Sequence, residues 1–207
     1  MGLFISFEGI DGSGKSTITK LVYEYFLEKN TNVMLTREPG GNIIAEKIRE
    51  LILDPINDTM DDRTEALLFA ASRRQHLVEK ILPALKEKTL VICDRFIDSS
   101  IAYQGYGKEL GAEEVMEINK FAIESHMPKF TIFLDVDVKT GLSRIGTRDT
   151  LDRLEESGND FFHRVYNGYQ EIIKDNPRII VVDGTRDVET VTKEVIKIIE
   201  ERMMLHA

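Results

Sequence analysis

The sequence contains a single cysteine and no long apolar run. Cys93 is the only cysteine among 207 residues, so an intramolecular disulfide is excluded and a reducing, cytoplasmic compartment is expected. Because Cys93 ends the apolar run 90–93, we interpret it as a small buried hydrophobe rather than a reactive thiol. No apolar stretch approaches the roughly 20 residues that cross a bilayer, and no basic segment followed by a long apolar one opens the chain. We therefore expect no membrane partner.

A surplus of positive charge is also missing. The chain has 27 Lys and Arg against 36 Asp and Glu, for a formal net charge of −9. Such a protein has no whole-surface field to attract DNA or RNA, so we expect no nucleic-acid partner and only locally held phosphates. Its 42% hydrophobic content and lack of low-complexity tracts predict a sizeable core. At this length, one domain spanning 1–207 is expected.

Short apolar runs alternate with longer stretches in which apolar residues recur every three or four positions. This alternation predicts an α/β fold with a five-stranded, mainly parallel sheet and helices on both faces. The predicted strands are 3–7, 32–36, 89–93, 131–134 and 179–182. The apolar helical stripe through 68–85 is longer than packing on the sheet requires. It is either plain core or a helix-to-helix dimer interface, so a homodimer stays an open alternative.

One segment, 146–158, has little apolar content and many charges, so it is excluded from the core. It is either a solvated loop or a mobile cover over a polar ligand. Glycines at both of its ends would permit hinging, which is what a small lid requires.

A phosphate-binding loop occupies 9–16, GIDGSGKS, which matches GxxxxGK(S/T). The loop follows a predicted strand and is followed by a predicted helix, as phosphate binding by such a loop requires. Glycine backbone N–H groups and the helix N-terminus would cradle phosphates, and the Ser16 hydroxyl could ligate Mg²⁺. We expect a nucleoside triphosphate site formed by Gly9, Asp11, Gly12, Ser13, Gly14, Lys15, Ser16 and Thr17.

The nucleotide is expected to be ATP, because a guanine-reading NKxD motif is missing. The nearest match, Asn119-Lys120-Phe121-Ala122, lacks the aspartate and falls in a predicted helix.

Four motifs in order carry a family resemblance. They are FEGIDGSGKST at 7–17, TREPGG at 36–41, DRFIDSSIAYQG at 94–105 and LDR at 151–153. With them the chain resembles the bacterial thymidylate kinases of the nucleoside monophosphate kinase superfamily over essentially its whole length. The resemblance implies a P-loop NTPase fold with a lid, and Mg²⁺-dependent transfer of the γ-phosphoryl group of ATP to dTMP, giving dTDP and ADP.

Phosphoryl transfer between two anions requires several cations at their junction. The resemblance supplies Lys15, Arg95, Arg148 and Arg153 together with Mg²⁺. Arg95 follows a strand at the edge where such sheets bind ligands, and its planar fork suits the acceptor phosphate. The alternative for Arg95 is a surface arginine paired with a neighbouring acid.

Two acids are assigned from the resemblance. Asp11 would handle Mg²⁺ or the deoxyribose 3′-hydroxyl, and Glu38 would have a similar role. The alternative for Glu38 is a turn residue that caps the helix beginning near Asn42. A cis bond is expected at Pro39.

The acceptor base is placed by the same comparison between Phe69, which would stack on thymine, and Arg73, which would hydrogen-bond its carbonyl edge. Their spacing of four residues puts both on one helix face. Without the resemblance, Phe69 reads as core and Arg73 as solvated. Ser100 and Gln104 would add base contacts, and Tyr103 would crowd the sugar 2′ position and reject ribose.

The chain departs from some thymidylate kinases at Gly12, where they carry an arginine. A catalytic arginine would then come from the lid, Arg153 first and Arg148 second. Arg144 is expected over the adenine or the phosphates, and the turn at 184–185 near the adenine.

Two rival functions remain at this stage. One is a kinase for another nucleotide or a deoxynucleoside, since the DRF element also resembles those enzymes. The other is a nucleotide-gated switch without acceptor chemistry, for which no second anion pocket would be expected.

Overall fold

The computed structural model describes residues 2–145, 152–155, 158–174 and 176–204. The strands are β1 (Leu3–Glu8), β2 (Val33–Arg37), β3 (Leu90–Asp94), β4 (Phe130–Asp135) and β5 (Ile179–Asp183). The helices are α1 (Lys15–Glu28), α2 (Ile43–Leu53), α3 (Asp62–His76), α4 (Leu82–Lys86), α5 (Ile97–Ser100), α6 (Ala112–Ile123), α7 (Val138–Ile145), α8 (Asn159–Ile173) and α9 (Val188–Met204). A 3₁₀ turn lies at Pro55–Asn57, and π-helical turns lie at Leu77–Ile81 and Ile101–Gly107.

The five strands form one sheet in the order β2-β3-β1-β4-β5, and every neighbouring pair is parallel. All five predicted strands are confirmed, and no strand end differs from the prediction by more than one residue. The predicted α/β class is confirmed as well, and the sheet is wholly rather than mainly parallel among the described residues.

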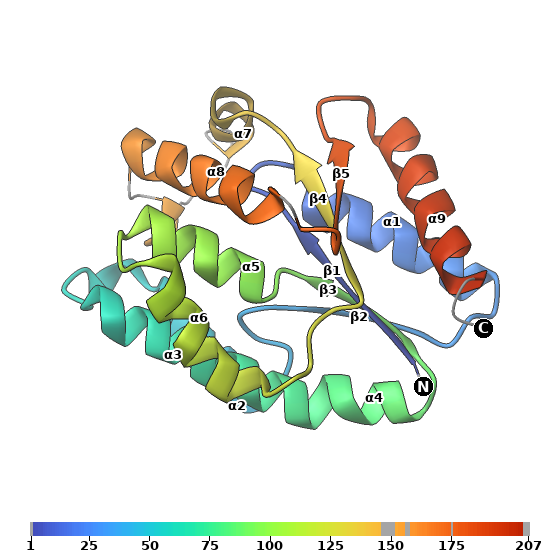
Figure 1. The fold of residues 1–207 in the computed structure, drawn as a ribbon, viewed down its shortest axis with the longest axis horizontal. Helices are drawn as coiled ribbons and strands as arrows, with labels where there is room; N and C mark the ends of the chain where they lie inside the picture. The colour runs from blue at the N-terminus through green and yellow to red at the C-terminus, as the bar shows by residue number, and fades with distance from the viewer. Residues whose placement is uncertain (1, 146–151, 156–157, 175, 205–207) are drawn as a thin grey trace.

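Helices cover both faces of the sheet, as Figure 1 shows, with α1 and α9 on one side and α3, α4, α6 and α8 on the other. The central strand β1 explains this arrangement, because its successive side chains point to opposite faces. Ile5 and Phe7 pack with Val22 of α1 and Val195 of α9, whereas Phe4 packs in the cluster on the opposite face. Both faces of β1 are therefore core.

The predicted long helical stripe corresponds to α3, a π-helical turn and α4 in unbroken succession. Cys93 is fully buried in β3, which confirms its interpretation as a core residue. Among the described helices, none has the length and apolar character that would let it cross a membrane.

The strand topology brings the sequence motifs together. β1 runs into the phosphate loop, β2 into the REPGG motif and β3 into the DRF motif. Because these three strands are parallel neighbours, all three motifs lie at the carboxyl edge of the sheet, which is where ligands bind in open α/β folds.

Candidate active site

The phosphate loop connects β1 to α1. Gly14 is the N-cap of α1 with a left-handed φ of 90°, so the backbone turns into the helix without a side chain at that point. The Lys15 Nζ atom donates to the carbonyl oxygens of Gly9 and Ile10, each at 2.9 Å. Burial and then the neighbouring Arg95 lower the pKa of Lys15 to about 8, against opposing acids. This strand, loop and helix N-terminus form the cradle that the sequence predicts for phosphates.

Gly12 explains why this loop carries no arginine of its own. Its φ is 76°, and a Cβ atom there would lie 2.1 Å from the carbonyl oxygen of Gly141 in α7. The loop and α7 are in direct backbone contact, and any side chain at this position would separate them. An arginine at position 12 would therefore displace α7.

A Mg²⁺ ion would find oxygen ligands at the start of α1. The Ser16 hydroxyl donates to the Asp94 carboxylate at 2.8 Å. No cluster of three or more His, Cys, Asp or Glu side chains suited to a metal occurs in the part of the chain that is described. A hydroxyl and one carboxylate beside the phosphates fit Mg²⁺, which binds proteins through few side chains and keeps several waters. Sequence reasoning missed Asp94 as a candidate ligand.

Arg95 is the most heavily bonded cation at the site. Its Nη1 atom donates to the Gly9 carbonyl at 3.1 Å and to the Ser99 hydroxyl at 3.0 Å. Its Nη2 atom pairs with Asp11 at 2.5 Å. The backbone has φ 72° at Arg95, in the left-handed region that non-glycine residues adopt infrequently. The alternative of a surface arginine is wrong, although a paired acid is present.

Asp11 faces Arg95 from the phosphate loop. The Tyr103 hydroxyl donates to the Asp11 carboxylate at 2.8 Å and accepts the Asp11 backbone N–H at 3.1 Å. Burial favours the neutral acid, but Arg95 and then Lys15 outweigh it and lower the pKa of Asp11 to about 2. Asp11 is therefore a carboxylate at neutral pH and can bind a metal or accept a hydroxyl hydrogen bond.

A buried acid lies beneath Arg95. Glu8 is 1% exposed, accepts the Phe96 N–H at 2.7 Å, and accepts the hydroxyls of Ser99 and Tyr169 at 2.5 and 2.9 Å. The same two hydroxyls accept from Arg95. Burial and the nearby Asp98 raise the pKa of Glu8 to about 7, against the opposing effect of Arg95. Sequence reasoning did not single out Glu8.

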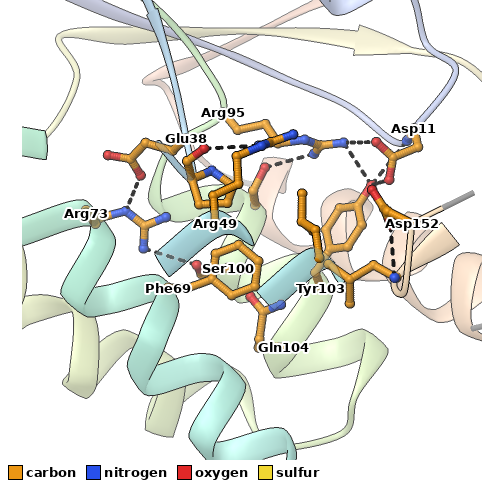
Figure 2. Close-up of a pocket in the computed structure, with 14 residues that line it drawn as sticks. Asp11, Glu38, Arg49, Phe69, Arg73, Arg95, Ser100, Tyr103, Gln104 and Asp152 are labelled. Carbon is orange, nitrogen blue, oxygen red and sulfur yellow. Dashed lines mark hydrogen bonds and ion pairs between the residues drawn. The ribbon is translucent and has the colours of Figure 1, made fainter. Parts of the chain in front are cut away.

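All seven residues predicted to bind the acceptor line one cavity. Figure 2 shows these side chains converging from β-strand ends and helices, with Arg95 and Asp11 at one end and Phe69 and Gln104 at the other. The predicted members are Glu38, Phe69, Arg73, Arg95, Ser100, Tyr103 and Gln104, and the predicted Asp11 is there too. The residues that sequence reasoning missed are Pro39, Arg49, Leu53, Ser99, Asp152 and Leu154.

Arg73 lines this cavity and is fixed by several hydrogen bonds. Its Nε atom donates to Glu38 at 2.7 Å, Nη1 donates to Ser100 and Asn119, and Nη2 donates to the Phe96 carbonyl at 3.1 Å. A guanidinium has five N–H groups, so these four bonds leave one donor. The side chain is 2% exposed, and its interpretation as a solvated residue is wrong. Phe69 is half-buried and lines the cavity.

Glu38 does not cap the helix that follows it. Asn42 caps α2 with its own side chain, accepting the Ala45 N–H at 2.9 Å. The Glu38 carboxylate instead bonds both Arg73 and His76, the latter at 2.9 Å. The bond between Glu38 and Pro39 is cis, as expected.

Residues 152–155 of the predicted lid lie against the acceptor cavity, which Asp152 and Leu154 line. Arg153 pairs with the buried Glu65 and donates from Nε to the Ile52 carbonyl at 2.8 Å. The Arg153 guanidinium therefore makes these contacts at the end of the acceptor cavity that is farther from the phosphate loop. Arg148, the second lid arginine, lies outside the described residues, as do 146–151 and 156–157.

A second cavity adjoins the phosphate loop. Arg144 of α7 donates to the Gly12 carbonyl at 3.1 Å, and Arg144 and Gly184 line this cavity together with Ser13, Gly14 and Thr17. The structure therefore brings together the residues expected around the adenine and phosphates.

A parallel sheet, a phosphate loop and an adjoining arginine-rich cavity are the features of a P-loop nucleotide kinase. The family model for thymidylate kinase matches residues 7–195. The chain is 55% identical to a thymidylate kinase of Finegoldia magna, over 98% of this chain and 100% of the relative. It is 52% identical to one of Enterococcus faecalis, over 97% of each.

A solved structure is similar as well. The crystal structure of thymidylate kinase from Ehrlichia chaffeensis superposes with a TM-score of 0.77 at 40% identity, covering 96% of this chain and 98% of that one. The chain belongs to the thymidylate kinase family.

Proposed function

We propose that this chain transfers the γ-phosphoryl group of ATP to dTMP with Mg²⁺ and releases ADP and dTDP. The observation that carries the proposal is the single acceptor cavity, which meets the phosphate loop at Asp11 and Arg95. Two nucleotides placed in the two cavities would meet end to end at these residues. Such positioning, with electrostatic stabilisation, is the main requirement of phosphoryl transfer.

The acceptor phosphate is proposed to bind at Arg95, where Arg49 also lines the cavity. The phosphate oxygen is already nucleophilic at neutral pH, so no general base is needed. Lys15 and Arg95 would stabilise the charge that spreads over the transferred group. Mg²⁺, held near Ser16 with Asp94 or Asp11, would supply further positive charge at the ATP phosphates.

The base is proposed to lie on Phe69, with its carbonyl edge at the remaining Arg73 donor. Tyr103, fixed by Asp11, would stand against the sugar and leave no partner for a 2′-hydroxyl. These contacts support a deoxyribonucleotide with a pyrimidine base as the acceptor.

A panel of monophosphates and nucleosides in an ADP-release assay tests this function. We expect dTMP to give the highest kcat/KM, and turnover of deoxynucleosides alone would favour the rival kinase. Arg95→Ala should raise the KM for dTMP by about 10- to 100-fold, because a charge-assisted hydrogen-bond set is lost. The control is Lys197→Ala, which removes an exposed cation of α9 paired with Glu201 and should leave both KM values unchanged.

The lid arginines require a separate measurement. Arg153→Ala should lower kcat if Arg153 leaves Glu65 to reach the moving phosphoryl group, as the catalytic role of this residue requires. It should instead raise the KM for dTMP if Arg153 only anchors 152–155 beside the acceptor. Arg148→Ala tests the other lid candidate in the same way.

A homodimer is proposed on the basis of exposed apolar side chains on neighbouring helices. The largest on α2, α3 and α6 are Ile43, Ile44, Leu51, Leu67 and Phe121. Several large apolar side chains exposed on packed neighbouring helices support an interface between two copies of the chain. Light scattering coupled to gel filtration would give twice the 23.6 kDa chain mass for a dimer, whereas the chain mass itself would refute it.

A further inference from the structure

Glu65 is a buried acid that contacts the base end of the acceptor cavity without lining it. It is 0% exposed and lies in the first turns of α3. The Gln104 side chain, which does line the cavity, donates from Nε2 to Glu65 Oε1 at 2.9 Å. Figure 2 shows the Gln104 amide beneath Phe69, at the end of the cavity away from Arg95.

The second Glu65 oxygen is paired with Arg153 from the segment 152–155. A buried acid with an arginine against it is stabilised as a carboxylate. A carboxylate is an acceptor only, so it must face the NH₂ group of the Gln104 amide rather than its oxygen. No hydrogen bond to Gln104 Oε1 is found from any described residue, which leaves that oxygen as the polar atom available to a ligand.

We propose that Glu65 is a positioning residue for acceptor selectivity, which fixes the Gln104 amide so that its carbonyl oxygen is presented to the base. The inference rests on the proposed function, because it concerns the same acceptor cavity. Glu65 itself touches no substrate and acts through Gln104.

The fixed orientation discriminates between pyrimidines by their hydrogen-bonding edges. Thymine and uracil carry an N3–H donor, which a carbonyl oxygen can accept. Cytosine has a lone pair at N3, which a carbonyl oxygen repels and an amide NH₂ would bind. A site with fixed polar partners rejects the wrong edge strongly, because the buried groups stay unpaired.

The remaining Arg73 donor acts in the same direction. It can bond the O4 carbonyl of thymine but opposes the N4 amino group of cytosine. Because Arg73 is held by Glu38, Ser100 and Phe96, this part of the selectivity should persist when Glu65 is changed. Loss of Glu65 is therefore expected to weaken the discrimination against cytosine without abolishing it.

The test is Glu65→Gln, a change of similar shape that lets residue 65 either donate or accept. We would measure kcat/KM of wild type and variant for dTMP, dUMP and dCMP. The dTMP/dCMP ratio should fall by about tenfold or more, because the Gln104 amide is free to turn. The dTMP/dUMP ratio should not change, because both acceptors carry N3–H, and this ratio serves as the internal control.

Gln104→Leu provides a second variant that avoids any change at the buried acid. It should lower the dTMP/dCMP ratio, and Glu65→Gln added to it should lower the ratio no further. The inference is overturned if Glu65→Gln leaves the dTMP/dCMP ratio intact or shifts both ratios equally. It is also overturned if Gln104→Leu keeps the wild-type ratio, or if Glu65→Gln still acts when residue 104 is leucine.

These outcomes are distinct from a failure of the proposed function. A wild-type enzyme that turns over no dTMP would contradict the proposed reaction, and the inference would fall with it. An active, dTMP-selective wild type with an unaltered Glu65→Gln ratio would contradict the inference alone.

Discussion

Replacing Glu8 by glutamine should make the stability of this protein less dependent on pH. In the folded protein the pKa of Glu8 is about 7, raised from 4.5 chiefly by burial and by Asp98. Between about pH 4.5 and pH 7 the folded state therefore binds a proton that the unfolded chain does not. The stabilisation that Glu8 contributes is fully present below its pKa in the unfolded chain. It is lost as the pH rises through the pKa of Glu8 in the folded protein.

The size of the effect follows from the pKa difference. Each unit is worth about 1.4 kcal/mol, so raising the pH through this window should cost the wild type about 3 kcal/mol more than Glu8→Gln. Glutamine keeps an acceptor for the Phe96 N–H and offers a donor to the hydroxyls of Ser99 and Tyr169, which bond Glu8 in the wild type. The variant should therefore fold and retain the surroundings of Arg95.

Urea unfolding followed by far-UV circular dichroism would measure this difference, because the chain has no tryptophan to report by fluorescence. Free energies of unfolding would be taken at intervals from about pH 5 to about pH 8. Glu117→Gln is the matched control, since Glu117 is an exposed acid on α6 whose ion pair among the described residues is with its neighbour Lys120. It should give a curve parallel to that of the wild type.

A constant difference between wild type and Glu8→Gln over this pH range would refute the reasoning. That outcome would mean that Glu8 is ionised throughout in the folded protein, with Arg95 outweighing burial. The reasoning would also be refuted if the wild type became more stable relative to Glu8→Gln as the pH rises, because that change has the opposite sign.

Three further changes have expected outcomes of their own. Gly12→Ala should destabilise by more than about 1 kcal/mol and weaken ATP binding, seen as a lower melting temperature and a smaller ATP-induced shift. Ile199→Ala, in the α1 and α9 core, should cost about 2–5 kcal/mol in urea unfolding with unaltered KM values. Asp11→Asn should lower stability by about 2 kcal/mol at neutral pH, because the depressed pKa of Asp11 stabilises the fold above its unfolded value. This deficit should shrink as the pH falls from about 4 to about 2, and a deficit that persists there would contradict the ion-pair explanation.

The strands and the phosphate loop were predictable because their signals are local. A strand covered on both faces is a short apolar run, and the four residues 90–93 are enough to predict one. The glycine spacing of the phosphate loop is likewise read from eight consecutive residues. Predicting that Phe69 and Arg73 bind the acceptor base required both their helical spacing and the family resemblance.

The residues that were missed act across the fold. Asp94 meets Ser16 only because β3 lies beside β1, and the sheet order is not written in either motif. Glu65 was missed because its partner Arg153, although predicted as a lid arginine, lies 88 positions away in the sequence, and Glu65 alone resembles an ordinary charged residue. Arg49 follows REPGG on an amphipathic helix, and the pattern gave no sign that its side chain turns to the cavity.

The backbone contact between Gly12 and Gly141 has a consequence for the chain's variability. Gly141 is also too crowded for a side chain, since a Cβ atom there would lie 2.7 Å from the Asp11 carbonyl oxygen. Two segments separated by more than half the sequence thus meet backbone to backbone at these two glycines. A change at either glycine has to be accommodated by shifting a whole helix, so we expect the two positions to vary together in evolution or not at all.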